Sequence, residues 1–208
     1  MSEMALFDSA GRQRIEAAIR EAERSTAGEF VVVSVPRCDA YHAVRLAYAA
    51  ALALGVAALV HVLHPLIPIG LLLWLEAAVA VVLWFALNIP ALLRVVLPEG
   101  PAEFRAAARA RIEFLSHRVY DTRDHTGVLI FLSELEHQVV ILGDAGIYER
   151  VQASGFQAHV DRVVAAVRAG RAADGVCEVI GELGKLLAAE FPPRADDTNE
   201  LSNAVRER

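Results

Sequence analysis

The feature that most constrains this chain is a long internal stretch with almost no charge. The 208 residues include 26 acidic and 20 basic side chains, yet Glu76 is the only one of them between Leu46 and Leu93. Two apolar runs, 46–63 and 67–87, fill most of this stretch. Each is close to the roughly 20 residues that a helix needs to cross a bilayer. The sequence therefore predicts two transmembrane helices.

Only three residues, 64–66, separate the two runs. Pro65 and Pro68 interrupt helical hydrogen bonding there, which predicts a hairpin with a short tip. The tip has no Lys or Arg, whereas arginines flank both ends of the hairpin: Arg37, Arg45, Arg94, Arg105, Arg109 and Arg111. By the positive-inside rule both termini are expected in the cytoplasm. A multi-pass protein of the inner (cytoplasmic) membrane, in contact with membrane lipid, is predicted.

Another interpretation of the hairpin is the buried core of a large soluble protein. About 160 remaining residues could not readily cover two helices that are apolar on every face, which disfavours it. Glu76 is predicted to be an intramembrane contact, either with another helix in an oligomer or as a protonated acid bonded to a carbonyl; a proton-linked site stays open. Small residues on the first helix permit close helix approach: Ala47, Ala50, Ala51, Ala53, Gly55, Ala57 and Ala58. A homo-oligomer or a complex with another membrane protein is expected.

Periodic patterns outside the hairpin predict alternating helices and strands. Helices are expected over 9–25, 101–120, 156–169 and 174–191, and strands over 29–35, 127–132 and 137–142. In the helix over 101–120, Phe104, Ala108, Ile112 and Leu115 fall on one apolar stripe. The last two strands flank the turn 133–136 and should form a β-hairpin.

These elements predict an α/β fold with helices packed on a short sheet of about three to four strands, in a small three-layer-like arrangement. Residues 1–42 and 98–191 should fold together as one discontinuous cytoplasmic domain, into which the membrane hairpin 43–97 is inserted. The tail 192–208 is polar, and we expect it to be loose.

The charge distribution excludes one class of function. The net charge is −6, and Arg and Glu alternate without forming a basic stripe, so nucleic acid is not an expected partner. Cys38 and Cys177 lie far apart in the sequence, which argues against a disulfide framework or a zinc site. A reducing compartment is consistent with this.

Four segments resemble the TPM domain family, which includes a thylakoid-lumen acid phosphatase and a photosystem II repair factor. Residues 25–36, with Thr26-Ala-Gly-Glu29, are similar to the family's Thr-Gly-Ala-Glu motif and first strand. Residues 126–133 and 139–144 are similar to its second and third strands, and Gly170 and Gly175 to its closing turn. The resemblance is nearest to a membrane-anchored bacterial branch. It implies the TPM fold and a LemA-type membrane protein as a possible partner.

In the wider family, acids and glycines before the second strand and after the third strand surround a groove that can hold a divalent cation. The residues here suggest that oxygen ligands for Ca²⁺ or Mg²⁺ could be assembled from Asp121, Asp124, Asp144 and Glu149, at strand and helix ends. The alternative is that these acids cap helices and solvate loops, as Asp144 before Ala145 would do.

Two hypotheses about function follow. The first is a non-catalytic interaction or assembly module held at the cytoplasmic face of the membrane. The second, implied by the resemblance to the lumenal family member, is a divalent-metal-dependent acid phosphatase. No convergent set of nucleophile and base is evident in the sequence, and this favours the first; catalytic residues are not assigned.

Overall fold

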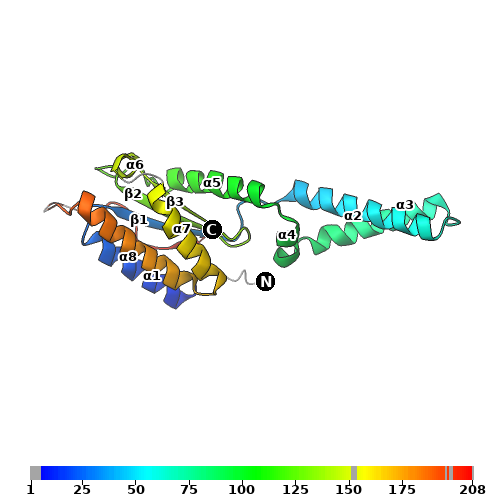
Figure 1. The fold of residues 1–208 in the computed structure, drawn as a ribbon, viewed down its shortest axis with the longest axis horizontal. Helices are drawn as coiled ribbons and strands as arrows, with labels where there is room; N and C mark the ends of the chain where they lie inside the picture. The colour runs from blue at the N-terminus through cyan, green and yellow to red at the C-terminus, as the bar shows by residue number, and fades with distance from the viewer. Residues whose placement is uncertain (1–5, 151–153, 195, 197–198, 208) are drawn as a thin grey trace. The chain divides into compact units, whose positions relative to one another are not determined.

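The computed structural model describes residues 6–150, 154–194, 196 and 199–207 (Figure 1). The chain divides into two compact units, one of Met1–Cys38 with Ala102–Arg208 and one of Asp39–Pro101. The described part of the first unit contains α1 (Ser9–Glu23), β1 (Glu29–Val35), most of α5 (Glu99–Ser116), β2 (Gly127–Ser133), β3 (Gln138–Gly143), α6 (Ala145–Arg150), α7 (Ser154–Arg168), α8 (Ala172–Glu190) and β4 (Arg206–Glu207). The second contains α2 (His42–Leu63), α3 (Ile69–Ala86) and α4 (Pro90–Val96).

The first unit is built on a four-stranded sheet in the order β3-β2-β1-β4. β1 runs parallel to β2, with Glu29 opposite Gly127 and Val35 opposite Ser133. β3 returns antiparallel to β2, which confirms the predicted β-hairpin. The mixed α/β class and the three longer strands are as the periodic patterns predict, because β-branched runs between turn residues favour strands.

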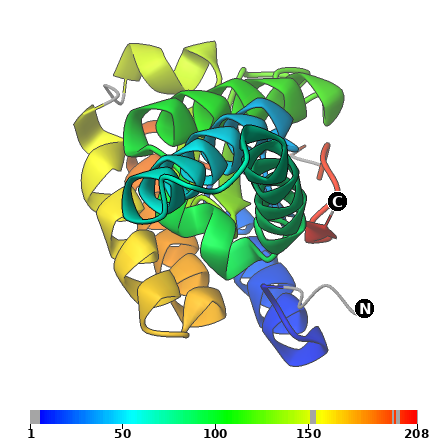
Figure 2. The ribbon, with the colours of Figure 1, turned by 90° about the vertical axis from the view of Figure 1, so that its right-hand side faces the viewer.

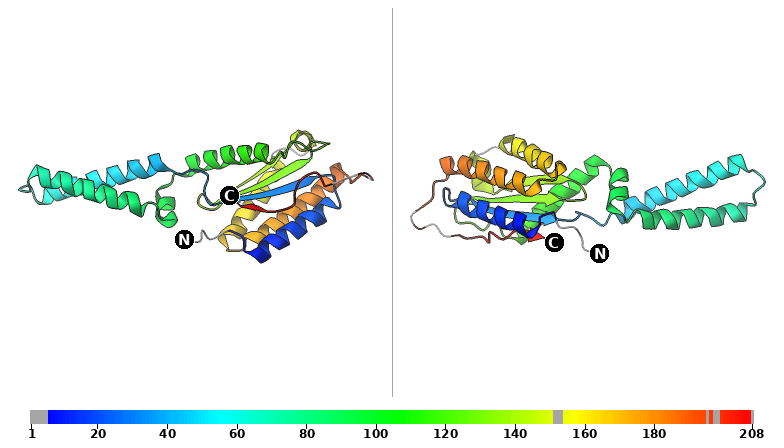
Figure 3. Two further views of the ribbon diagram at one scale, coloured as in Figure 1. Left: turned by 180° about the vertical axis from the view of Figure 1, so that it is seen from behind. Right: turned by 90° about the horizontal axis from the view of Figure 1, so that it is seen from below.

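Helices cover both faces of this sheet, as the views from behind and below show (Figure 3). Every residue of β1 and β2 is buried, as expected of strands with a layer on each side. On one face Phe30, Ile130 and other strand side chains pack with residues of α1, α7 and α8. On the opposite face Val31 and Phe131 pack with Ala106 and Ala110 of α5.

The apolar stripe of the helix over 101–120 does not face the sheet. Phe104, Ile112 and Leu115 are exposed on α5. The side of α5 that is buried instead carries Ala102, Ala106, Ala110 and Glu113. Small side chains let the helix pack close to the sheet.

The prediction of a loose tail is also wrong for the residues described there. β4 pairs in parallel with β1, where Val33 lies opposite Arg206 and Ser34 opposite Glu207. Glu29 of β1 accepts hydrogen bonds from the backbone N–H groups of Glu200 at 3.1 Å and Leu201 at 3.3 Å. Part of the C-terminal segment therefore covers the β1 edge of the sheet.

The second unit is a helical hairpin, seen nearly end-on in Figure 2. The buried residues of α2 recur every fourth position, Arg45, Ala49, Ala53 and Ala57, which is one side of a helix. α3 has no fully buried residue. By length and composition α2 and α3 are each able to cross a membrane, and most of their large apolar side chains are exposed.

Candidate functional site

The N-terminal ends of β1 and β2, the two central strands, lie together at one end of the sheet. A polar hollow of about 380 Å³ lies beside the start of β1. Three arginines and two glutamates contribute to its lining, which comprises Arg20, Glu23, Arg24, Thr26, Glu29, Pro193, Arg194 and Asn199. Its residues come from the end of α1, the turn before β1 and the segment after α8. We call this the polar edge, and it includes the Thr-Ala-Gly-Glu segment that carries the family resemblance.

Two threonines fix the backbone of that segment. The Thr26 hydroxyl donates to the Phe191 carbonyl oxygen at 2.8 Å and accepts from the Gly28 N–H at 3.1 Å. The Thr126 hydroxyl donates to the Ala27 carbonyl oxygen at 2.7 Å. Because both hydroxyls are engaged with backbone groups, they hold the start of β1 against β2 and against the end of α8.

The acids beside β1 are engaged with backbone and with the C-terminal segment. Glu23 accepts a hydrogen bond from the Phe30 N–H at 3.0 Å and contacts the side-chain amide of Asn203. Burial raises the pKa of Glu23 to about 7, and the neighbouring charge of Glu29 acts in the same direction. Glu23 can therefore exchange a proton near neutral pH.

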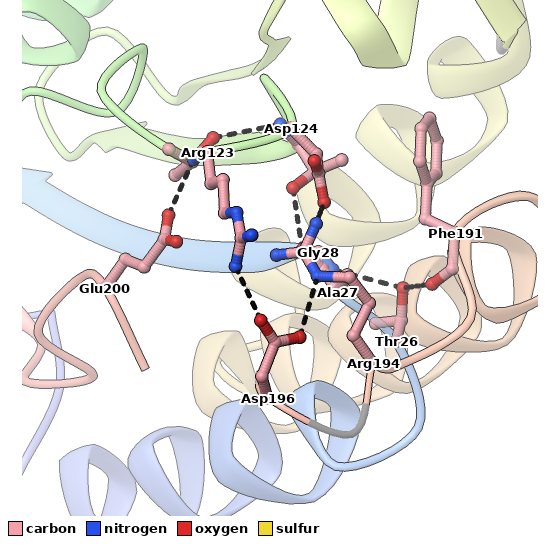
Figure 4. A network of polar contacts seen from close by, with 11 residues as sticks. Thr26, Ala27, Gly28, Arg123, Asp124, Phe191, Arg194, Asp196 and Glu200 are labelled. Carbon is pink, nitrogen blue, oxygen red and sulfur yellow. Dashed lines mark hydrogen bonds and ion pairs between the residues drawn. The ribbon is translucent and has the colours of Figure 1, made fainter. Parts of the chain in front are cut away.

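Two arginines join the segment after α8 to the loop before β2 (Figure 4). Arg194 forms an ion pair with Asp124. Arg123 pairs with Asp196 at 2.9 Å, and its backbone N–H donates to Glu200 at 2.8 Å. The arginine partners lower the pKa of Asp196. Asp197 and Thr198 lie outside the described residues.

The four acids predicted to share a metal have other partners or are exposed in the structure. Asp121 is exposed and pairs with Arg118 at 2.6 Å, while Asp124 is taken by Arg194. Glu149 is exposed on α6. In the described ranges no three His, Cys, Asp or Glu side chains are grouped as a cation would require. The residues present do not fit the divalent cation that the resemblance implies.

Asp144 alone among the four is buried, and its surroundings match the capping alternative. Its carboxylate accepts from the Ala145 N–H at 2.7 Å at the start of α6, and it contacts His125 Nδ1 at 3.0 Å. The carbonyl oxygen of Asp144 also accepts from the N–H groups of Ile147 and Tyr148. Asp144 thus directly precedes a short helix and contacts its first N–H group.

Neither cysteine has the surroundings of a nucleophile. Burial raises the pKa of Cys38 to about 12, which disfavours the reactive thiolate. Burial likewise raises the pKa of Cys177, on α8.

The hairpin has a polar cluster of its own at its open end. The buried Arg45 side chain donates to the Ala40 carbonyl oxygen at 3.0 Å, contacts His42 and Asn88, and lies over the ring of Trp84. Glu76 lies eight positions before Trp84 in α3, which corresponds to about 12 Å along the helix from the cluster. In an antiparallel pair it is level with Ala53, which lies eight positions after Arg45 in α2. Glu76 is half-buried, deep in the apolar part of the hairpin.

The contribution of the C-terminal segment to the polar edge is not evident from the sequence. Residues 192–208 are expected to be a loose tail, whereas Arg194 and Asp196 contact residues before β2, and Glu200 contacts Glu29, the first residue of β1. The charges of the segment could have indicated these contacts. Arg194 is complementary to Asp124, and Asp196 and Glu200 are complementary to Arg123.

Comparison with known proteins relates the chain to one solved structure. No protein-family model and no curated protein matches the sequence. The NMR structure of the BA42 protein from the psychrophilic bacterium Bizionia argentinensis is similar over 100% of both chains, with a TM-score of 0.63 and 20% sequence identity. This similarity concerns the fold.

Proposed function

We propose that this chain is a membrane-anchored domain of TPM type that acts as a non-catalytic interaction or assembly module at the cytoplasmic face of the inner membrane. The observation that carries the proposal is the exposed apolar surface of the hairpin unit. Leu59, Leu73 and Val82 are among many large apolar side chains of α2 and α3 that the described residues leave uncovered. Such a surface is unfavourable in water and is satisfied by hydrocarbon.

The arginines at the ends of the hairpin support its orientation. Arg37 precedes α2, Arg45 lies in the first turn of α2, and Arg94 lies in α4. The tip between α2 and α3 has neither Lys nor Arg. This asymmetry supports a cytoplasmic location for both termini and for the α/β unit.

The hairpin also supports assembly with further helices. Two helices alone leave much lipid-facing surface, and small residues such as Ala50 and Ala58 on the exposed side of α2 allow another helix to approach closely. Glu76 would supply a polar contact in hydrocarbon, where an unsatisfied carboxyl is costly. The partner is a second copy of this chain or another membrane protein, of LemA type if the family resemblance holds.

Alkaline carbonate extraction of membranes that contain the full-length chain tests the anchor. We expect the chain to stay in the membrane pellet, as a protein with spanning helices does. Release into the supernatant, in vesicles whose known integral proteins are retained, would contradict the anchor.

Substitutions of Glu76 test the assembly. Glu76→Leu should leave the protein membrane-integrated but reduce the size of the complex extracted in mild detergent, whereas Glu76→Gln, which keeps hydrogen-bonding groups, should retain it. Leu73→Ala on an exposed side of α3 serves as the control for a lipid-facing change. An unchanged complex in Glu76→Leu would exclude Glu76 as the contact.

The alternative function, a metal-dependent acid phosphatase, has less support. It rests on resemblance, and a shared fold does not establish a shared activity. The ion pairs of Asp121 with Arg118 and of Asp124 with Arg194 compete with metal ligation. Turnover of a phosphate monoester that depends on added Mg²⁺ and is lost in Asp124→Asn and Asp144→Asn would favour this alternative.

A further inference from the structure

The outward side of α5 is an apolar row on a helix whose other side is already packed on the sheet. Phe104, Ile112 and Leu115 are 73%, 54% and 62% exposed, with Ala108 between them. Their spacing of four, four and three residues places them on one side of a helix. Ala102, Ala106 and Ala110 occupy the opposite side and are buried. α5 is therefore apolar on two opposite sides, and one of them lacks a cover within the described residues.

Basic residues accompany this outward row. Arg111 is exposed and falls three residues after Ala108 and four before Leu115, so it lies within the row. Arg105 and Arg109 are half-buried on the neighbouring side of the helix, where Arg109 pairs with the buried Glu113, so Arg111 is the arginine that belongs to the row. An exposed row of Phe, Ile and Leu with an exposed arginine among them is typical of helices that lie in the bilayer interface.

The chain connection restricts where α5 can be. α5 begins at Glu99, thirteen residues after α3 ends at Ala86, and α4 takes up Pro90–Val96 of that interval. A helical segment of this length with extended residues around it spans at most about 35 Å. Leu92 and Val95 of α4 are exposed apolar residues within this connection. If α3 spans the membrane, the start of α5 is held close to the membrane surface.

We propose that the outward row of α5, Phe104, Ala108, Ile112 and Leu115, lies in the headgroup region of the cytoplasmic leaflet, with Arg111 beside the phosphates of anionic lipids. This inference rests on the proposed membrane anchor. It commits to lipid rather than to a second copy, because an antiparallel two-fold pairing of the rows would bring the two Arg111 side chains to within about one helical turn of each other.

Fluorescence quenching tests the contact on the full-length chain. With Cys38→Ser and Cys177→Ser as background, Phe104→Cys, Ile112→Cys or Leu115→Cys is labelled with an environment-sensitive fluorophore. The protein is then reconstituted in vesicles of phosphatidylcholine and phosphatidylglycerol, with and without spin-labelled lipid. Leu186→Cys on α8 is the matched control, because Leu186 is an exposed leucine of a helix on the other face of the sheet.

We expect the three α5 labels to shift to shorter emission wavelength and to lose most of their emission to spin-labelled lipid, whereas the control label does not. Adding Arg111→Glu should reduce this loss in vesicles with phosphatidylglycerol, since it reverses the charge beside the lipid phosphates. A wavelength shift without lipid quenching would mean that protein covers the row, and would overturn the proposal. So would unshifted labels, equal quenching of the control, or no effect of Arg111→Glu.

Carbonate extraction of the same vesicles separates this inference from the proposed anchor. If the chain is retained and the α5 labels are not quenched, only the lipid contact of α5 fails. If the chain is released, the anchor itself fails, and with it the basis of the inference.

Discussion

The guanidinium carbon of Arg45 lies 5.0 Å from the ring centroid of Trp84, and this contact joins the start of α2 to the end of α3. His42 stacks near the same ring, with centroids 6.1 Å apart, and Asn88 contacts the guanidinium from beyond α3. A cation over an indole face is attracted most strongly where water is excluded. This cluster therefore fixes the open end of the hairpin.

Arg45→Met should loosen that end of the hairpin while keeping its apolar length. Trp84 loses the cation over its ring, so in a Trp74→Phe background its fluorescence should change in intensity and become more accessible to a water-soluble quencher. Arg37→Met, at an exposed arginine outside the cluster, is the control and should leave the signal unchanged. Equal spectra for the two variants would contradict the cluster.

Gly127 and Gly181 should respond in opposite ways to the same added methyl group. A Cβ on Gly127 would lie 2.0 Å from the Val119 carbonyl oxygen, whereas a Cβ on Gly181 has no atom within 4 Å. Gly127→Ala should destabilise the α/β unit by about 2 kcal/mol or more through overpacking. Gly181→Ala, inside α8, should stabilise it by up to about 1 kcal/mol. Urea unfolding in detergent micelles, followed by circular dichroism, measures both.

Stability should fall as the pH rises because of Glu23. Its pKa is about 7 in the folded chain and 4.5 as the ordinary value, so between these pH values the folded state binds more protons than the unfolded state. The favourable effect of the protonated acid is complete below pH 4.5 and is lost as the pH rises through 7. Glu23→Gln should therefore raise the urea midpoint at pH 8 and leave it little changed at pH 4.5.

Glu21→Gln is the matched control for this pH dependence. Glu21 is an exposed residue of the same helix, paired with Arg24 at 2.8 Å. Its replacement should give the same pH profile as the unaltered chain. A Glu23→Gln profile that also followed the unaltered chain would show that Glu23 does not titrate in this range.

The buried Glu113 should make Arg109 important for stability. Arg109 contacts the Glu113 carboxylate through Nη2 at 2.8 Å and Nε at 2.9 Å, and His117 approaches it at 3.3 Å. Arg109→Met leaves a carboxylate buried with less compensation and should cost about 2 kcal/mol. Adding Glu113→Gln removes that charge and should recover part of the loss. Additive losses in the double variant would contradict the pairing.

Local patterns predict most of the elements but not all of their packing. Strand β1 and helices α2 and α3 were evident because β-branched runs, turn residues and long uncharged runs are properties of neighbouring residues. The side of α5 that packs on the sheet is not evident from the sequence. The sheet contacts the small residues Ala106 and Ala110, while the larger apolar residues Phe104 and Ile112 are exposed. Which of two apolar sides is buried depends on the shape of a surface formed by distant residues.

The polar edge could be predicted only in part for the same reason. The Thr-Ala-Gly-Glu segment is evident from a short motif, as is Asp144, which lies outside the polar edge. The partners of Glu29 and Asp124 are Glu200, Leu201 and Arg194, which lie far along the chain from them and in a segment with little periodicity. The two-residue strand β4 likewise has no local pattern; it depends on β1 as its pairing partner.

The native mass of the unaltered full-length protein, extracted from its own membranes in mild detergent, tests the central claim most directly. The account predicts one discrete complex, made of several copies of this chain or of this chain with a second membrane protein. The mass of a single copy of the chain would contradict the claim that the protein is an assembly module. The detergent concentration must be one at which known complexes of the same membrane remain intact.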